Sequence, residues 1–224
     1  PKVTEYIPDI IQFVKDLVDN KKAYVIDGEV FFEIKTFSTY GKLSGKNLDD
    51  LVAGQRVDVD TRKKNPADFV LWKPSKEGEP SWDSPWGKGR PGWHIECSAM
   101  IQKILGDTID IHGGGIDLIF PHHENEIAQG EGRTSKCYCN NWMHNDFLNL
   151  NDEKMSKSIG NIVTARAFMD KYHPEILKYL MLSHHYRALF NLNEEKINLC
   201  FSGLARIYGS LKEANAVLQD ESLT

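Results

Sequence analysis

The sequence predicts an α/β fold that contains part of a parallel sheet, and two observations support this. The segment "DTIDIHGGG" has the pattern of a short strand that runs into a glycine turn, and "NNWMHNDFLNL" has the pattern of a further strand. The segment "FPHHENEIAQ", which lies between them, is predicted to be helical. Strand, turn, helix and strand in this order are typical of parallel α/β sheets, whose ligands lie beyond the carboxyl ends of the strands.

The first half of the chain is predicted to contain a helix, a hairpin and a long loop. Hydrophobic residues at helical spacing predict an amphipathic helix over about residues 5–20. Two β-rich runs joined by Asp27-Gly28 predict a hairpin. A loop with a short helix is expected from "TYGKLSGKNLDDLVAG", and a return to strand from "VDVDTRKKNPADFVLWK". Residues 74–92 are rich in Pro, Gly, Ser and Trp and predict a long ordered loop, after which a helix is expected from Trp93.

The end of the chain, beyond "NDEKMSKSIGN", is predicted to be mostly helical. Thr164 has the position of a helix cap, Pro174 can begin the next helix, and one long helix is expected from Asn193 almost to the end.

Composition limits the classes of function. The chain has 224 residues, 41% hydrophobic, with a formal net charge of −5, so any contact with RNA has to use local basic patches. Its four cysteines show no CxxC spacing, which argues against a disulfide framework and favours a reducing, cytoplasmic location. We expect no membrane association, because no apolar run is long enough to cross a bilayer.

A metal site is one interpretation of the helix start. His122 and Glu126 are four residues apart and therefore share a helix face, although this spacing alone more often marks a solvated polar helix start whose glutamates complement the dipole. Cys97 adds a thiol, and the three residues together offer the S, N and O ligands that zinc accepts. The alternative for Cys97 is a buried core cysteine. Three protein ligands would leave the open position that is typical of catalytic zinc.

Two loops have both a functional and a structural interpretation. "KMSKS", Lys154 to Ser158, carries lysines and hydroxyls that suit polyphosphate, whereas most loops of this composition are solvated linkers. "HGGG", His112 to Gly115, could be the oxyanion loop of a hydrolase, but the GxSxG sequence that this requires is not present. The glycines otherwise indicate a tight turn or a close approach of backbone to a ligand.

The segments "GRPGWHIECSAM", "DIHGGGIDLIFPHHENEIAQ" and "EKMSKSIGN", in this order and spacing, resemble the cysteinyl-tRNA synthetase family of class I aminoacyl-tRNA synthetases. The resemblance covers essentially the whole chain. It implies the second half of a Rossmann-like nucleotide-binding fold, with a β-containing connecting insertion and a C-terminal helical region. The implied segments are the insertion at 1–85, the catalytic fold at 86–148, the KMSKS loop and stem-contact region at 149–189, and the start of a helical bundle at 190–224.

The resemblance also implies a role for each candidate residue. Cys97, His122 and Glu126 would be ligands of one Zn²⁺, to which the family adds a cysteine from an earlier segment. The implied contacts to ATP and its Mg²⁺ are Lys154, Lys157 and Gly114, with both lysines acting in catalysis. The implied contacts to the amino acid are Trp93, Asp117 and His112.

The implied reaction is the activation of L-cysteine by ATP to cysteinyl-adenylate, followed by transfer to the 3′ end of tRNA(Cys). Zinc would select cysteine, because it binds a thiolate far better than the hydroxyl of serine, and pocket shape separates near-isosteres poorly. A cytoplasmic monomer is expected. The alternatives are a cysteine ligase of thiol-cofactor (mycothiol-type) biosynthesis and a non-catalytic fragment with structural zinc.

This sequence departs from the family pattern in two places. Neither a HIGH-type ATP motif nor the earlier zinc cysteine occurs in the 224 residues, and the chain stops before an anticodon-recognition region would be complete. We therefore expect an internal portion of a synthetase that is inactive alone.

Overall fold

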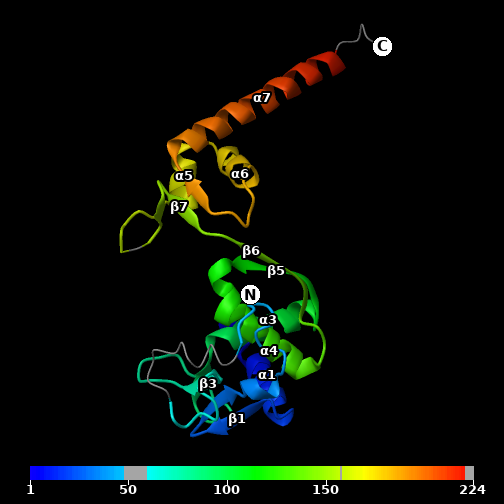
Figure 1. Ribbon diagram of the computed structural model, residues 1–224, viewed down its shortest axis with the longest axis vertical. Coiled ribbons are helices and arrows are strands. Elements are labelled where there is room, and N and C mark those ends of the chain that lie inside the picture. Colours follow the sequence, from blue (N-terminus) through cyan, green and yellow to red (C-terminus); the bar gives the residue numbers. More distant parts are fainter. Residues whose placement is uncertain (48–59, 157, 220–224) are drawn as a thin grey trace. The chain divides into compact units, whose positions relative to one another are not determined.

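The structure is a computed structural model that describes residues 1–47, 60–156 and 158–219. It divides into two compact units, Pro1–Met143 and His144–Thr224, and each is described by itself (Figure 1). The elements of the first unit are α1 (Ile7–Asp19), β1 (Ala23–Ile26), β2 (Glu29–Phe32), β3 (Phe69–Pro74), β4 (Gly89–Pro91), α3 (Trp93–Leu105), β5 (Ile109–Gly115), α4 (Glu124–Thr134) and β6 (Cys139–Asn145), the last of which crosses the boundary. The elements of the second unit are β7 (Leu148–Leu150), β8 (Glu153–Lys154), α5 (Ala165–Lys171), α6 (Pro174–Leu182), β9 (Phe190–Leu192) and α7 (Glu194–Leu218).

An antiparallel sheet in the order β1-β2-β3-β4 forms one layer of the first unit. The predicted hairpin is confirmed, because β1 pairs with β2 and Ile26 lies opposite Glu29. Asp27 and Gly28 have φ values of 50° and 82°, the left-handed conformations that a type I′ turn requires at both central residues.

The predicted first helix is confirmed as α1, and it packs its apolar face against this sheet. The shared core joins α1 to the sheet and also to α3 and α4, through the buried residues Ile10, Phe13, Val14, Leu17, Val30, Phe32, Leu71, Trp72, Ile95, Ala99 and Ala128. The first 85 residues therefore share a core with the segment that follows them. The predicted division into four segments stays a prediction.

The predicted glycine turn after "DTIDIH" is wrong. Gly113 and Gly114 extend β5 up to Gly115, and the turn follows as a 3-10 turn at Ile116–Leu118. β5 pairs with β6: the Ile109 N–H donates to the Tyr138 carbonyl, and a Cβ on Gly113 would lie 3.5 Å from the Met143 carbonyl. The residue numbers rise along both strands from the first contact to the second, so the two strands are parallel. With the antiparallel sheet and the helices, this makes the unit a mixed α/β structure.

The long loop predicted at 74–92 ends in a strand that was not predicted. β4 pairs antiparallel with β3, and at Gly89 a Cβ would come 2.4 Å from the Lys73 carbonyl oxygen, so only glycine allows this approach. The end of the loop therefore runs along the sheet as β4 and leads directly into α3. Most of the predicted short helix, at residues 48–54, and the start of the predicted strand, at 57–59, lie outside the described residues.

Local signals place the helices of the second unit correctly. Thr164 caps α5 by accepting the Ala167 N–H, and Asn193 caps α7 by accepting the Lys196 N–H. Pro174 is the first residue of α6, as predicted. The strand predicted over "NNWMHNDFLNL" is two strands, β6 and β7, and the sequence did not predict β9, which pairs in parallel with β7.

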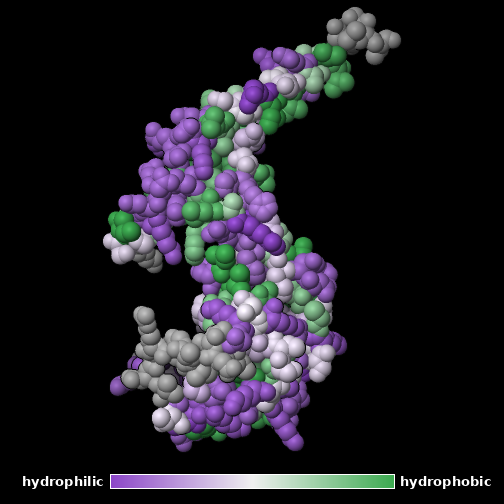
Figure 2. Space-filling model, viewed as in Figure 1, coloured by the Kyte–Doolittle hydropathy of each residue, from purple (hydrophilic) through white to green (hydrophobic). Residues whose placement is uncertain are grey.

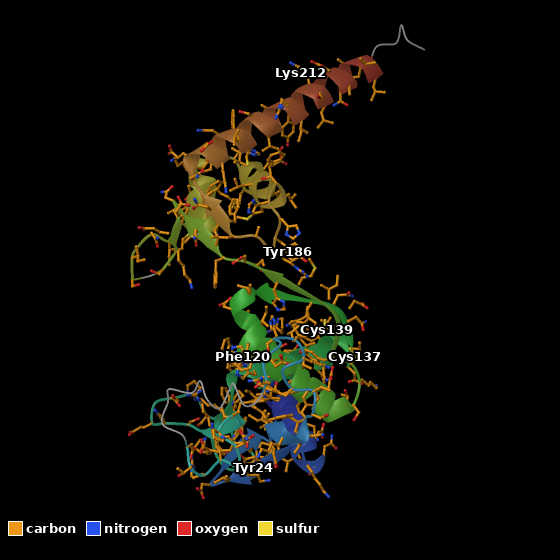
Figure 3. The ribbon with its side chains drawn as sticks, viewed as in Figure 1. Tyr24, Phe120, Cys137, Cys139, Tyr186 and Lys212 are labelled. Atoms are coloured by element: carbon orange, nitrogen blue, oxygen red, sulfur yellow. The ribbon has the colours of Figure 1, made fainter. Side chains whose placement is uncertain are left out.

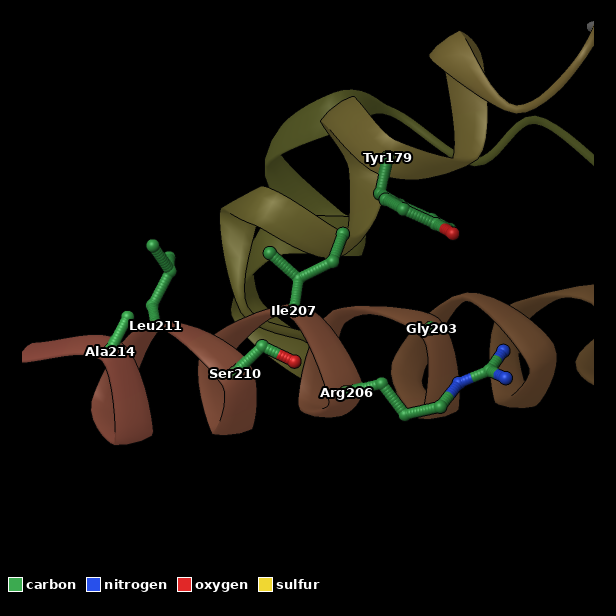
Figure 4. Close-up of a pocket in the computed structure, with 7 residues that line it drawn as sticks. All are labelled: Tyr179, Gly203, Arg206, Ile207, Ser210, Leu211 and Ala214. Atoms are coloured by element: carbon green, nitrogen blue, oxygen red, sulfur yellow. The ribbon is translucent and has the colours of Figure 1, made fainter. Parts of the chain in front are cut away.

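α6 and α7 pack together at Gly203. A Cβ there would lie 2.6 Å from the Tyr179 hydroxyl, so the glycine makes room for this tyrosine (Figure 4). A cavity of about 630 Å³ follows α7 from this point. Hydrophobic side chains are exposed on the surface of α7 (Figure 2), among them Leu199, Phe201, Leu211, Val217 and Leu218. Among the described residues, no helix combines the length and the apolarity that crossing a membrane requires.

Candidate metal centre

Two helices of the first unit bring the three predicted ligands together. Cys97 lies near the start of α3, Glu126 lies in the first turn of α4, and His122 lies in the irregular turn that precedes α4. One ligand atom from each residue lies within 4.8 Å of the other two. The sequence could pair His122 with Glu126 through their spacing, but only the packing of α3 on α4 adds Cys97.

The Glu126 carboxylate is fully buried, and its two oxygens have different surroundings. Oε2 lies 3.1 Å from His112 Nε2 and accepts a hydrogen bond of 3.1 Å from the Tyr138 hydroxyl. Oε1 lies 2.8 Å from His122 Nε2, and no group among the described residues donates a hydrogen bond to it in good geometry. Although burial favours the neutral acid, the neighbouring His112 and His122 outweigh it and lower the pKa of Glu126 to about 2. A buried anionic oxygen without a donor is costly, and a bound cation would relieve that cost.

A second histidine fixes the orientation of His122. The Nδ1 atoms of His94 and His122 are 2.8 Å apart, so one ring donates to the other. Burial, and then the charge of His122, lower the pKa of His94 to about 4, which keeps His94 neutral at physiological pH. When His122 is neutral and donates its Nδ1–H to His94, its Nε2 lone pair faces Glu126. Metal-bound histidines usually make this kind of hydrogen bond through their other ring nitrogen.

Cys97 is partly buried beside these groups. Burial, and then the charges of Glu126 and Glu96, raise the pKa of its thiol to about 11. The same negative charges that disfavour a free thiolate favour a cation at this point, and a coordinating thiol is deprotonated. One sulfur, one imidazole nitrogen and one carboxylate oxygen are a donor set that zinc accepts. The residues therefore fit a metal ion on two grounds, the orphaned Glu126 Oε1 and the chemistry of the donors.

The three donors border an open cavity of about 420 Å³. Its other wall is apolar and includes Met100, Ile101, Ile104, Leu105 and Leu118. A ligand can therefore reach the donors from the cavity side.

Glu124 and Glu126 are both buried, so the interpretation of a solvated polar helix start is wrong. Glu124 accepts hydrogen bonds from the backbone N–H groups of Gly41, Leu43 and Ser44, the shortest of them 2.8 Å. It therefore ties residues 41–44 to the start of α4, while Glu126 is left for the candidate site.

His112, a predicted contact to the amino acid, and Gly114, a predicted contact to ATP, lie beside the metal set. His112 and His123, with Glu126, form a second group of potential ligand atoms within 4.8 Å of one another. A Cβ on Gly114 would lie 2.6 Å from Cε1 of His123, so the glycine lets this ring approach β5. The close approach expected of the glycines is thus made, in this structure, to a histidine ring.

The predicted substrate contacts lie on the same unit. The Trp93 ring is exposed by 58%, and its centroid is 4.4 Å from that of His122. Asp117 is exposed in the turn after β5, where a Cβ on Gly115 would come 2.4 Å from its Oδ1. Trp93 is therefore next to the donor set, and Asp117 follows the strand that carries His112.

The KMSKS loop belongs to the second unit. The exposed Lys154 is the last residue of β8, and its ammonium lies 4.2 Å from the centre of the Phe147 ring. Asn161 closes the loop by donating to the Lys154 carbonyl and by accepting the Ser156 N–H. Lys157 lies outside the described residues.

Sequence reasoning missed His94 and Tyr138. His94 lies within the motif "GWHIECS", but nothing local indicates that its ring meets His122 from another helix. Tyr138 lies beyond α4, and its contact with Glu126 depends on the path of the chain into β6. Neither position carries a local sequence signal for this role.

The chain is similar to known tRNA synthetases in sequence. The family model described as the class I (C) tRNA synthetase catalytic domain matches residues 1–202. The chain is 58% identical over 221 residues to a cysteine–tRNA ligase of Bdellovibrio bacteriovorus, covering 99% of this chain and 46% of that protein. It is 54% identical over 219 residues to one of Trichlorobacter lovleyi, covering 98% of this chain and 45% of the relative. The chain thus spans less than half the length of these relatives.

A solved structure described as an arginyl-tRNA synthetase from Campylobacter jejuni is similar in fold, with a TM-score of 0.50 and 13% identity. The match covers 86% of this chain and 34% of that one. At this identity the match supports the fold alone.

Proposed function

The chain belongs to the family of class I (C) tRNA synthetase catalytic domains, and from this premise we propose that it selects L-cysteine for activation by ATP and transfer to tRNA(Cys). Two relatives of more than 50% identity are cysteine–tRNA ligases, which supports this choice of amino acid. Within the proposal, residues 86–148 form the second half of a Rossmann-like fold, 1–85 the connecting insertion, 149–189 the KMSKS and stem-contact region, and 190–224 the start of a bundle.

The observation that carries the proposal is the donor set at the cavity. Cys97, His122 and Glu126 offer three ligand atoms, and Glu126 Oε1 is buried with no hydrogen-bond donor among the residues that the structure describes. Structural zinc sites have four protein ligands and are closed, whereas catalytic sites keep one position open. Three donors beside a cavity of about 420 Å³ therefore favour a metal site that binds a ligand at its open position over a metal site that only stabilises the fold.

Selection of the amino acid follows from this chemistry. Zinc, when bound, is a Lewis acid of borderline softness that accepts a thiolate as ligand far more readily than an alcohol, which is the difference between cysteine and serine. Two groups of the protein support this: a hydrogen bond with His94 orients the His122 ring, and the charge of Glu126 favours the cation. Trp93, whose ring lies beside that of His122, would cover the amino acid, and Asp117 and His112 would contact its polar groups.

Activation needs positioning and charge stabilisation, with no covalent intermediate on the protein. The cysteine carboxylate attacks the α-phosphate of ATP, and pyrophosphate leaves. Lys154 and Lys157 would neutralise charge on the leaving phosphates, with Mg²⁺ carried by ATP and Gly114 near the adenylate. Transfer to the 3′ end of the tRNA would follow.

Cobalt substitution tests the proposal. The protein is loaded with Co²⁺ and titrated with cysteine, serine and S-methylcysteine, while its absorption spectrum is recorded. We expect cysteine alone to add a thiolate-to-cobalt charge-transfer band to the one that Cys97 gives, because only the sulfur of cysteine can lose a proton and bind. Equal spectra with cysteine and S-methylcysteine would contradict the proposed role of the metal in selecting cysteine.

A further inference from the structure

We propose that Tyr138 is a positioning residue, whose hydroxyl holds the Glu126 carboxylate in the orientation that presents Oε1 to the metal. The inference rests on the proposed function in so far as that function needs a metal ion at Cys97, His122 and Glu126. It concerns a residue outside this ligand set, on the chain segment between α4 and β6.

The contact itself is specific. The Tyr138 hydroxyl donates to Glu126 Oε2 over 3.1 Å, and both side chains are fully buried. His112 Nε2 lies 3.1 Å from the same oxygen, so two groups hold Oε2, whereas none in the described part of the chain donates to Oε1. This arrangement directs the unoccupied oxygen toward His122, 2.8 Å away. Without the hydroxyl, His112 alone would hold Oε2, and the carboxylate could then rotate more freely about its last bond.

Tyr138 can act as a fixed support because its own backbone is anchored on both sides. Its N–H donates to the Glu131 carboxylate of α4 over 3.2 Å, and its carbonyl accepts the Ile109 N–H of β5 over 3.0 Å. The ring lies directly on α4, since a Cβ on Gly130 would come 2.3 Å from Cδ2 of Tyr138. Figure 3 labels Cys137 and Cys139, the residues on either side of it.

A packing role alone would not need the hydroxyl. The ring belongs to a hydrophobic cluster with Ile109, Ile127 and Cys139, and phenylalanine would fill the same space. The hydroxyl lies in a fully buried position, where it donates to the carboxylate of the candidate site and also lies close to the Ser98 hydroxyl. Residues that form hydrogen bonds with metal ligands typically contribute about 10-fold to 100-fold to metal affinity.

The test compares Tyr138→Phe with Tyr40→Phe in the full chain. Tyr40 is the matched control, because it is also buried and its hydroxyl donates to Asn125, the residue before Glu126 on the same helix. Zinc affinity is measured by competition with a chelator, cobalt spectra report the geometry of the ligands, and thermal unfolding reports stability. We expect Tyr138→Phe to weaken zinc binding by about 10-fold or more and to shift the cobalt d–d bands. Tyr40→Phe should leave both at the wild-type values, even if it lowers the melting temperature.

The inference is overturned if Tyr138→Phe binds zinc as the wild type does, or if Tyr40→Phe weakens binding equally. The cysteine-dependent band of the wild-type cobalt protein separates this result from the proposed function. A band in the wild type with no difference between the two variants defeats the inference alone. No band, together with weakened metal binding in Tyr138→Phe, defeats selection by the metal and leaves the positioning role standing. A wild type that binds no ion defeats both.

Discussion

Cys97 has to lose a proton before it can bind a metal ion, because the thiolate is the ligand. Burial, followed by the charges of Glu126 and Glu96, raises the pKa of its thiol to about 11, so the free thiol is protonated at pH 7 to 9. Metal uptake in this range should therefore release one proton from Cys97, and the apparent affinity should rise roughly 10-fold per pH unit. The affinity is measured at pH 7, 8 and 9, and the released protons are counted with a pH indicator.

The control uses two cysteine substitutions. Cys97→Ser should weaken metal binding more than about 100-fold, because loss of a ligand costs more than loss of an outer hydrogen bond, and it should remove the Cys97 proton. Cys200→Ser replaces a buried cysteine of the second unit and should change neither quantity. Proton release that persists in Cys97→Ser would assign the proton to another group.

The sequence predicted the three metal ligands, but it did not predict the residues that hold these ligands in place. The spacing of His122 and Glu126 is a local property, and both residues do meet in the structure. Cys97 was a candidate because of its type, and its proximity depends on how two helices pack. The roles of His94 and Tyr138 depend on contacts between different elements, 28 and 12 residues apart in the chain, for which the sequence shows no local signal.

Among the elements, the loop before α3 is held closed by an ion pair. Arg90 donates two hydrogen bonds to Glu79, of 2.8 and 2.9 Å, and Glu79 also accepts the Lys76 N–H. The Arg90 hydrogen bonds, and then that of Lys76, lower the pKa of Glu79 to about 2. A glutamate has a pKa of about 4.3 in an unfolded chain, so this interaction stabilises the folded state above that pH and is lost as the pH falls toward 2.

Glu79→Gln should therefore lower the melting temperature near neutral pH, and the difference from the wild type should shrink between pH 5 and pH 2. The effect is modest, because both side chains are about one-third exposed. Thermal unfolding across this pH range measures it. Glu77→Gln, a substitution of an exposed residue in the same loop, is the control for the change in net charge. A difference that stays constant with pH would show that the carboxylate is not the stabilising group.

The elements that the sequence predicted are those with local signals. α1 follows from the spacing of its apolar residues, the hairpin from Asp27-Gly28, and α5 and α7 from their caps. The elements that the sequence did not predict are strands that form by pairing with strands elsewhere in the chain. β4 and β9 are three-residue strands that exist through β3 and β7, and the glycines of β5 are extended because β6 lies beside them.

At the scale of the whole molecule, the two halves of the proposed chemistry lie on different units. Cys97, His122 and Glu126 belong to Pro1–Met143, and the KMSKS loop belongs to His144–Thr224. The first set offers metal ligands at a cavity, and the second offers exposed lysine on a loop that Asn161 closes. Recognition of the amino acid and stabilisation of the phosphates are thus assigned to separate sets of residues, which mutation can separate.

Lys157→Ala, tested in a chain active in cysteine-dependent exchange of pyrophosphate into ATP, should lower the exchange rate about 100-fold or more, because a positioned cation stabilises charge that develops in the transition state. Cysteine affinity, read from the cobalt charge-transfer band, should stay within about threefold of the wild type, since removing an interaction made only in the transition state does not weaken ground-state binding. Lys178→Ala, which removes an exposed lysine from α6, is the matched control and should change neither quantity. Equal losses in rate and in cysteine affinity would mean that Lys157 supports the fold or the amino-acid site, and its assignment to the phosphates would have to be withdrawn.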